Sequence, residues 1–163
     1  MQGLYQIRKL SKCNITGLKK VSDILYECGK DMAKKYDLHH WDNSCIKNYI
    51  IVALCAIKND IYLVYSEKTP VATFQTRKME QSFLFQKLAT TPAFSGRGIG
   101  GYCLTELERL ARENGCTEVV CEVYDKSEHA KSFYEHRGYT TYGTTETLKY
   151  KELKLRKELR WEP

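Results

Sequence analysis

The sequence lacks a hydrophobic run long enough to cross a membrane, since its longest apolar stretch covers only residues 49–57 and a membrane helix needs about twenty. Its start, Met1-Gln-Gly-Leu-Tyr, lacks the pattern of a secretory signal. The seven cysteines include no Cys-x-x-Cys pair, so neither a disulfide framework nor a zinc site is predicted. Most of them stand in apolar positions, as small core residues do. We therefore expect a cytoplasmic protein with no membrane segment and no bound metal.

The sequence also lacks a long basic run, although Lys and Arg outnumber Asp and Glu by 26 to 20, which gives a net charge of +6. Scattered charge of this kind indicates solvated surface, and it disfavours a nucleic-acid-binding face. A positive balance suits a polyanionic small ligand. The 163 residues contain no internal repeat and are enough for one core, so we expect a single domain over residues 1–163.

The most informative stretch runs from Thr90 to Ala111, where Gly96, Gly98, Gly100 and Gly101 crowd together. An apolar run precedes them, and apolar residues at helical spacing follow them, which predicts a strand, a glycine loop and a helix. Glycines allow the backbone to approach a ligand closely, and the free amides of a helix N-terminus bind anions. The pattern predicts a phosphate-bearing cofactor at Ser95–Gly101, with Arg97 adding a positive charge.

Three other readings of the loop can be compared. A P-loop would end in Gly-Lys-Ser/Thr, which is absent here. Gly96-x-Gly98-x-x-Gly101 fits the dinucleotide fingerprint, with Glu122 as its ribose carboxylate. However, the loop does not follow its strand directly, and too little chain remains for the second half of that fold. A tight loop with no ligand is the third reading, and four glycines make it costly in backbone entropy.

The stretch resembles the acetyl-CoA loop of the GNAT superfamily of N-acetyltransferases, whose pattern is Arg/Gln-x-x-Gly-x-Gly/Ala. Here it reads Ser95-Gly96-Arg97-Gly98-Ile99-Gly100, so Ser95 replaces the leading Arg or Gln. A second motif of the family, Asn-x-x-Ala-x-x-Phe-Tyr-Glu-x-x-Gly-Phe, is similar to the segment from Ser127 to Tyr139. The two motifs occur in the family's order and cover about the C-terminal half.

Patterns along the chain predict the order β-α-α-β-β-β-α-β-α-β-β, which is an α/β fold. The first helix contains Gly29 as a weak point, the second runs from Ser44 through Ala53, and the last strands are Tyr139–Thr145 and Leu148–Leu159. The resemblance implies a mixed, mostly antiparallel sheet of about six or seven strands with about four helices. It also implies a V-shaped gap between Ser82–Thr90 and Glu118–Tyr124 that holds the pantetheine arm.

The resemblance implies acetyl-CoA as the cosubstrate and Tyr134 as the general acid that protonates the leaving thiolate. A phenol with a pKa near 10 is protonated at pH 7, as a proton donor must be. The helix pattern alone favours a different role for Tyr134, that of an amphipathic-helix residue packed beside the core residues Ala130 and Phe133. Backbone amides near Leu88–Thr90 would bind pantetheine and polarise the thioester carbonyl. The implied cofactor contacts are Leu88, Ala89, Thr90, Ser95, Gly96, Arg97, Gly98, Ile99, Gly100, Gly101, Ser127 and Tyr134.

The general base is less well defined, because the strand before the loop offers no carboxylate. Glu122 is the best candidate, and a chain of water molecules is an alternative. The loop around Trp41 and His40 is predicted to shape the acceptor pocket, or else to pack as a helix connector. A metal site at His39, His40 and Asp42 is disfavoured because adjacent side chains point apart, and an acetyl-cysteine route through Cys103 or Cys121 lacks a paired histidine.

The predicted function is transfer of an acetyl group from acetyl-CoA to a primary amine by direct attack in a ternary complex. The acceptor is a small molecule or a protein, and neither nucleic acid nor membrane is expected as a partner. The alternative is a CoA-binding module that senses or regulates without catalysis; a basic nucleic-acid-binding domain comes third. Either a monomer or a homodimer is compatible with the sequence.

Overall fold

The computed structural model of the chain describes residues 4–160. Its elements alternate in the predicted order, with two short 3₁₀ turns added. The strands are β1 (Tyr5–Lys9), β2 (Asp60–Ser66), β3 (Thr69–Met79), β4 (Ser82–Thr90), β5 (Glu118–Tyr124), β6 (Thr140–Glu146) and β7 (Lys151–Glu158). The helices are α1 (Ile15–Tyr36), α2 (Tyr49–Cys55), α3 (Ile99–Glu113) and α4 (Glu128–Glu135), and the 3₁₀ turns are η1 (Ser44–Lys47) and η2 (Pro92–Phe94).

The strands form a seven-stranded mixed sheet in the order β1-β2-β3-β4-β5-β7-β6. The mixed α/β architecture, the mostly antiparallel pairing and the four helices confirm the predicted fold class. Contacts along the chain group into two compact units. The first contains the residues up to Arg77 together with Lys87–Cys103, and the second contains Lys78–Gln86 and the residues from Leu104 onward.

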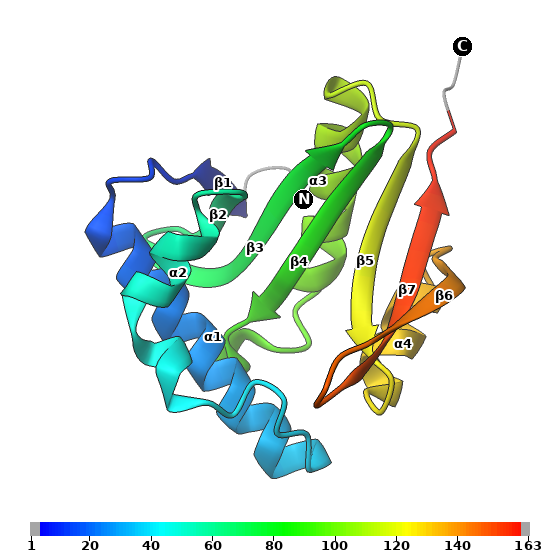
Figure 1. Cartoon of the computed structure of the whole chain (residues 1–163). Helices are drawn as coiled ribbons and strands as arrows, with labels where there is room; N and C mark the ends of the chain where they lie inside the picture. Colours follow the sequence, from blue (N-terminus) through cyan, green and yellow to red (C-terminus); the bar gives the residue numbers. More distant parts are fainter. Residues whose placement is uncertain (1–3, 161–163) are drawn as a thin grey trace. The chain divides into compact units, whose positions relative to one another are not determined.

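The core of the first unit forms where α1 and α2, which lie side by side, pack on one face of β2 (Figure 1). Period-2 alternation places Ile61, Leu63 and Tyr65 on that face, and all three are buried. The other face of the hairpin is also covered, since Tyr62 and Phe74 are buried and stack with ring centroids 4.9 Å apart. Burial on both faces of β3 also covers polar side chains, since Thr73, Gln75 and Thr76 are buried.

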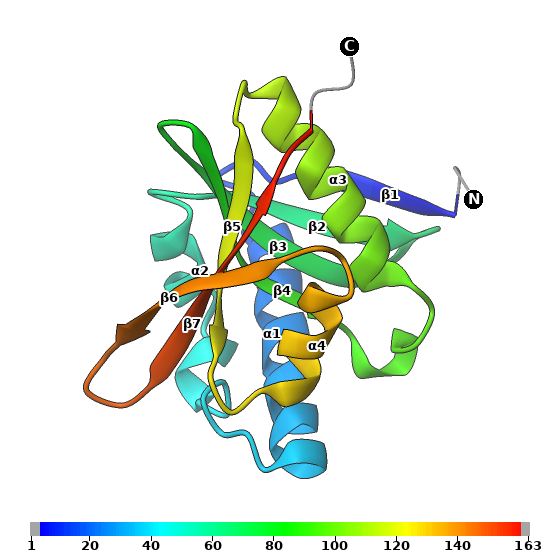
Figure 2. The same ribbon diagram turned by 90° about the vertical axis from the view of Figure 1, so that its right-hand side faces the viewer.

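In the second unit β5, β7 and β6 follow one another as antiparallel neighbours (Figure 2). β5 pairs with β7 along its whole length, from Glu118↔Glu158 to Tyr124↔Glu152. Its inward side chains alternate with outward ones, so Cys121 is buried while Glu122 is exposed. Strand β5 therefore presents two chemically different faces.

The parallel pairing of β4 with β5 is short. It covers Ser82–Leu84 against Glu118–Val120 and no further register is formed. Further along β4, Lys87 adopts a φ of 53°, a left-handed conformation that costs a non-glycine residue about 1–3 kcal/mol. Such a residue inside a strand bends it as a bulge does. The V-shaped gap itself stays a prediction.

The structure corrects two predicted boundaries. The second helix is two elements, η1 and α2, because Asn48 leaves the helical region with φ −83° and ψ 110° and caps α2 by accepting a hydrogen bond from the Ile50 amide. The strand expected from Leu148 begins at Lys151, because the preceding residues form a turn in which the Tyr150 amide donates to the Thr147 hydroxyl. The cysteines are also less uniformly buried than expected, since Cys13 and Cys45 are exposed.

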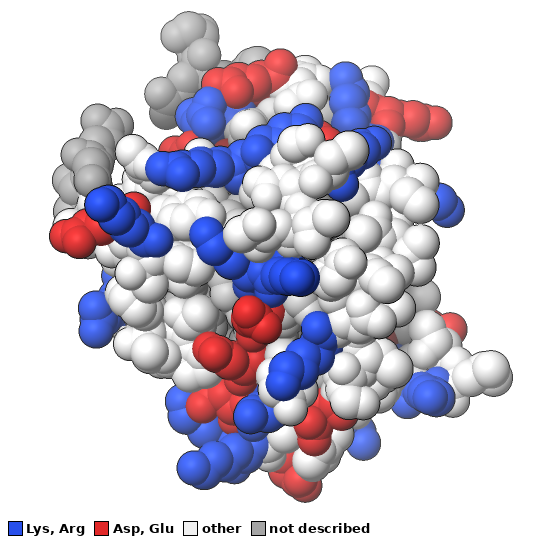
Figure 3. Space-filling model, turned by 90° about the vertical axis from the view of Figure 1, so that its left-hand side faces the viewer, with Lys and Arg blue, Asp and Glu red and all other residues white. Residues whose placement is uncertain are grey.

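Charge on the surface is dispersed. On the face shown in Figure 3, Lys and Arg side chains alternate with Asp and Glu and with uncoloured surface. Within residues 4–160, no helix combines the length and the apolar composition that a membrane crossing requires.

Candidate active site

The glycine loop lies in the first unit between η2 and α3. Gly96 and Gly98 have φ angles of 76° and 77°, and a Cβ added at either would meet no atom within 4 Å. Both positions therefore require glycine for backbone conformation and not for lack of space. Helix α3 begins directly afterwards at Ile99, so Gly100 and Gly101 belong to its first turn and not to the loop.

The start of α3 has the properties of an anion site. Its first turn contains no acidic residue, so the positive end of the helix dipole is not already neutralised. The Tyr102 amide donates to the Gly98 carbonyl at 3.0 Å, while the first amides of a helix lack such intrahelical partners. The Arg97 guanidinium stands over the Phe94 ring, 4.6 Å from its centroid, which keeps a cation at the loop.

Strand β1 holds the loop in place. The Tyr5 hydroxyl donates to the Arg97 carbonyl at 3.4 Å, and the Tyr102 hydroxyl donates to the Tyr5 carbonyl at 3.3 Å. The two tyrosine rings also pack with centroids 5.4 Å apart. Contacts on both sides of the loop make its conformation part of the fold before any ligand binds.

The end of β4 carries the main chain expected to meet the pantetheine arm. Lys87, in its left-handed conformation, donates from Nζ to the Cys55 sulfur at 3.3 Å. Leu88 and Thr90 are half-buried, and Ala89 is buried. Burial raises the pKa of the Cys28 thiol to about 11, although a hydrogen bond with the Thr90 main chain acts in the opposite direction.

Tyr134 lies in the second unit at the centre of an aromatic cluster. Its ring centroid is 5.8 Å from that of Phe85 and 5.7 Å from that of Tyr139, and its side chain is 9% exposed. The packing fixes the ring in one orientation, as a proton donor in catalysis requires. Ser127, the N-cap residue of α4, is 3% exposed and makes no capping hydrogen bond with its side chain.

Glu122 belongs to a pair of carboxyl groups that the sequence did not reveal. Its Oε1 accepts a hydrogen bond from the Thr145 hydroxyl at 3.2 Å. Burial raises the pKa of Glu152 on β7, and the charge of Glu122, to which it is hydrogen-bonded, raises it further. The arrangement therefore places the Glu122 carboxyl group beside a second carboxyl group whose pKa is raised.

Trp41 and His40 lie in the connection that follows α1. Trp41 packs against the core cluster of the first unit, and its ring is 5.9 Å from that of His40. A Cβ at Gly29 would come within 2.5 Å of the Trp41 carbonyl oxygen. Gly29, which weakens the helix in isolation, is therefore the residue that lets this connection approach α1.

His39 bridges two acids in the same connection. Its ring nitrogens lie 2.9 Å from Asp37 Oδ1 and 3.2 Å from Asp42 Oδ2, and hydrogen bonds with these carboxylates raise the pKa of His39. Among residues 4–160 no group of three His, Cys, Asp or Glu side chains is arranged to hold a metal ion.

The sequence prediction missed Glu152, Thr145 and the conformation of Lys87. Glu152 and Thr145 reach Glu122 only because β7 pairs with both β5 and β6. No local sequence pattern predicts this contact between residues of different strands. The surroundings of Glu118 were also not predicted; its Oε1 accepts from the Ser82 hydroxyl at 2.5 Å.

Comparison with known proteins defines the class. Residues 58–141 match the sequence model of the acetyltransferase (GNAT) domain, which is about half of the chain. The chain therefore belongs to the GNAT acetyltransferase family, whose members are acyltransferases. The match confirms the resemblance seen in the glycine loop and in the Ser127–Tyr139 motif. No curated protein sequence matches the chain.

Solved structures agree with the family. PaiA N-acetyltransferase from Thermoplasma acidophilum, solved with coenzyme A, is 18% identical with a TM-score of 0.74, covering 94% of this chain and 98% of its own. The ribosomal-protein-S18-alanine N-acetyltransferase of Escherichia coli is 13% identical with a TM-score of 0.74, covering 98% and 96%. A GNAT acetyltransferase from Elizabethkingia anophelis with acetyl-CoA bound is 12% identical with a TM-score of 0.70, covering 97% and 100%. At these identities the likeness concerns the fold.

Proposed function

We propose that this protein transfers an acetyl group from acetyl-CoA to a primary amine by direct attack in a ternary complex. The observation that carries the proposal is the glycine loop, in which Gly96 and Gly98 hold positive φ angles directly before an α3 N-terminus free of acids. In this proposal residues 95–101 bind the pyrophosphate and the main chain of Leu88–Thr90 binds pantetheine. The ligands of PaiA and of the Elizabethkingia protein are consistent with acetyl-CoA here.

In the proposed reaction the amine nitrogen attacks the thioester carbonyl carbon, and the carbon–sulfur bond then breaks. Tyr134 donates its phenolic proton to the departing thiolate, so that CoA leaves as a thiol. Main-chain amides at Leu88–Thr90 stabilise the negative charge that develops on the carbonyl oxygen. The Ser127 main chain at the start of α4 completes the cofactor contacts.

The amine must lose a proton before or during attack, and Glu122 is proposed to accept it. Its position supports this role, because Glu122 is an exposed carboxyl group on β5 whose Oε1 already accepts a hydrogen bond from the Thr145 hydroxyl. A carboxylate at this position also attracts an ammonium group. Trp41 and His40 are proposed to shape the acceptor pocket, for a small-molecule or a protein amine.

The proposals on domain organisation, localisation and partners rest on the sequence analysis. The chain acts as one domain over residues 1–163, in the cytoplasm, as a monomer or homodimer without nucleic acid or membrane partners.

The catalytic role of Tyr134 is tested by Tyr134→Phe, which keeps the ring packing and removes only the hydroxyl. We expect kcat to fall by about 100-fold or more, with acetyl-CoA affinity unchanged, in an assay of thiol release with an aliphatic diamine and with a peptide that has a free N-terminus. Tyr124→Phe, on β5, is the control and should retain activity. Acetyl-CoA binding without turnover of any amine by the wild type would instead support the non-catalytic CoA module.

The cofactor loop is tested by a matched pair of glycines. Gly98 and Gly115 have φ angles of 77° and 71°, and a Cβ at either would meet no atom within 4 Å. Valine at either position adds the same strain, about 1–2 kcal/mol, so both variants should lose thermal stability similarly. Only Gly98→Val should weaken acetyl-CoA binding, by at least about tenfold, in calorimetry. Equal affinity of the two variants for acetyl-CoA would show that the glycine loop does not bind the cofactor.

A further inference from the structure

A cavity of about 520 Å³ opens in the second unit, around the end of β7. It is lined by Glu108 and Arg112 of α3, by Gly138 and Thr140 at the start of β6, and by residues 156–158 and Arg160. Its volume falls within the range of small-molecule sites, about 300–1,000 Å³. None of these residues belongs to the cofactor loop, and Arg112 stands in the last turn of α3 whereas the loop precedes its first.

The cavity exists because β6 is shorter than its neighbour. The β6–β7 register begins at Thr140↔Arg156, so Lys157 and Glu158 extend past the start of β6. The chain enters β6 through Gly138, whose φ of 87° turns it away and whose Cβ position lies 3.5 Å from Lys157 Cε. The end of β7 is thus left open on the side where β6 would have continued.

The lining of the cavity carries an excess of positive charge. Lys157 and Glu108 form an ion pair with Nζ and Oε1 2.7 Å apart, so their charges cancel. Arg112, Arg156 and Arg160 make no ion pair with any residue in 4–160. Three guanidinium groups against Glu158 leave a net charge of +2.

A buried hydroxyl adjoins the same region. Tyr139 lies between two lining residues, is 1% exposed, and its hydroxyl has no hydrogen-bond partner among residues 4–160. Burial raises the pKa of Tyr139, and the Glu108 carboxylate raises it further, which shows that the phenol lies near Glu108. The hydroxyl therefore remains a protonated donor at neutral pH.

We propose that this cavity is a second anion site, separate from the cofactor loop, which binds a small polyphosphate such as a nucleoside triphosphate. Guanidinium groups donate pairs of hydrogen bonds that match phosphate oxygens, and two or more of them suit an anion with several phosphates better than a single carboxylate. Among residues 4–160, Arg112 of α3 and Arg160 after β7 contact neither a ring nor a carboxylate, whereas the Arg156 guanidinium stands over the Tyr142 ring, 5.4 Å from its centroid. The Lys157–Glu108 ion pair joins α3 to β7 within the lining.

The test is calorimetric titration of the full chain with ATP and, separately, with inorganic tripolyphosphate, in buffer containing saturating CoA so that the loop is occupied. We expect both to bind. Equal affinities mean that the phosphate chain alone is recognised, and tighter ATP binding means that the nucleoside contributes; either result supports the site. Arg112→Gln combined with Arg160→Gln should weaken binding at least tenfold.

The matched control is Arg109→Gln, which removes the same charge from the same helix. Arg109 forms ion pairs with Glu106 and Glu113 and does not line the cavity, so Arg109→Gln should leave polyphosphate binding unchanged. The Arg112→Gln/Arg160→Gln double variant should keep the circular dichroism spectrum and the Tm of the wild type. The proposal is overturned by an absence of binding at millimolar concentration, by affinity that survives the double substitution, by binding that saturating CoA abolishes, or by a single-stranded oligonucleotide binding where ATP does not.

Discussion

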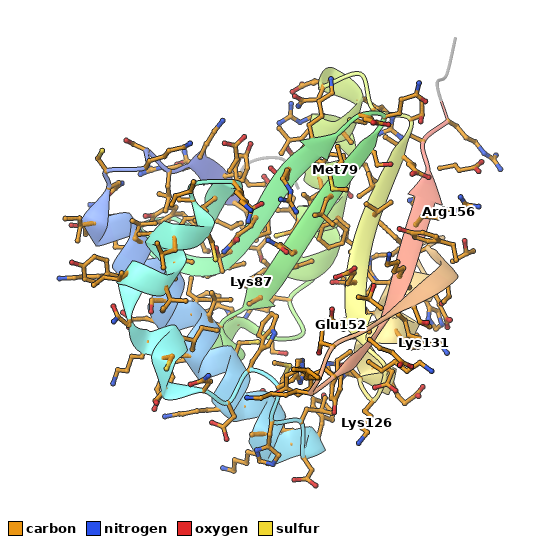
Figure 4. All side chains as sticks on the ribbon, viewed as in Figure 1. Met79, Lys87, Lys126, Lys131, Glu152 and Arg156 are labelled. Atoms are coloured by element: carbon orange, nitrogen blue, oxygen red, sulfur yellow. The ribbon has the colours of Figure 1, made fainter. Side chains whose placement is uncertain are left out.

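Strand β7 takes part in two groups of side chains of opposite charge, an acidic pair near its beginning and the cationic lining of a cavity at its other end. At its beginning Glu152 meets Glu122 of β5 and, through it, Thr145 of β6. At its other end Arg156 and the following residues border the cationic cavity. Figure 4 labels Glu152 and Arg156 at separate positions along the same strand. One short strand thus provides an anionic pair suited to an amine and a cationic wall suited to a phosphate.

The acidic pair and the arginines differ in how the fold accommodates charges of the same sign. At one end burial raises the pKa of Glu152, and the charge of Glu122 raises it further, so Glu152 can respond to the repulsion by binding a proton more readily. The arginines at the other end cannot lose their protons, so they remain charged and are separated over α3 and β7. The net charge of +6 conveys nothing of this segregation.

Glu122→Gln removes the anionic end and has the largest expected effect. If Glu122 accepts the proton of the amine, kcat/KM should fall by about 10–100-fold at pH 7, and the acidic limb of the pH–rate profile should disappear. Glu118→Gln, on the same strand and face, is the control; an equal loss in both would point to structure and not to proton transfer.

Lys157→Gln should change the cationic end more moderately. The substitution frees the Glu108 carboxylate and lowers the charge of the cavity lining from +2 to +1, so we expect tripolyphosphate to bind about three- to tenfold more weakly. Losing a charged hydrogen bond of about 1 kcal/mol should also lower Tm by about 2–4 °C. Lys131→Gln, whose ion pair with Glu135 spans 4.0 Å, should change neither quantity. If Lys157→Gln bound tripolyphosphate as tightly as the wild type, the Lys157–Glu108 ion pair would have no part in the anion site.

Glu152→Gln should have the smallest effect, seen in thermal unfolding. The pKa of Glu152 is raised in the folded protein, so its ionisation destabilises the fold at pH 7 and does not below the ordinary carboxyl pKa, where both states are protonated. The variant should therefore have a slightly higher Tm than the wild type at pH 7, and the gain should shrink as the pH falls toward 4. Glu27→Gln, on the exposed side of α1, should show no such dependence. A gain independent of pH would contradict the raised pKa of Glu152.

Features that depend on neighbouring residues could be predicted from the sequence. The glycine loop and the start of α3 at Ile99 follow from a strand, four glycines and a helical period within one short stretch. The order of elements followed from periodicity for the same reason. The break at Asn48 was less visible, because a capping asparagine and a helical asparagine look alike in sequence.

Features that depend on pairing between distant segments could not be predicted. Glu122 and Glu152 are adjacent only through the β5–β7 register, and a shift of one residue would place them on opposite faces. The cavity draws its lining from three separate segments of the chain. Lys87 adopts a conformation that its residue type disfavours, so tertiary packing overrides local preference there.

The contacts of Tyr5 with the glycine loop have a consequence for the order of folding. Its hydrogen bonds reach Arg97 and Tyr102, residues 92 and 97 positions away. Contacts of such long sequence separation form late, because the intervening chain must first be closed. The loop therefore takes its final shape only when the earliest strand of the chain has docked, and the first unit becomes competent to hold its ligand as one of the last events of its assembly.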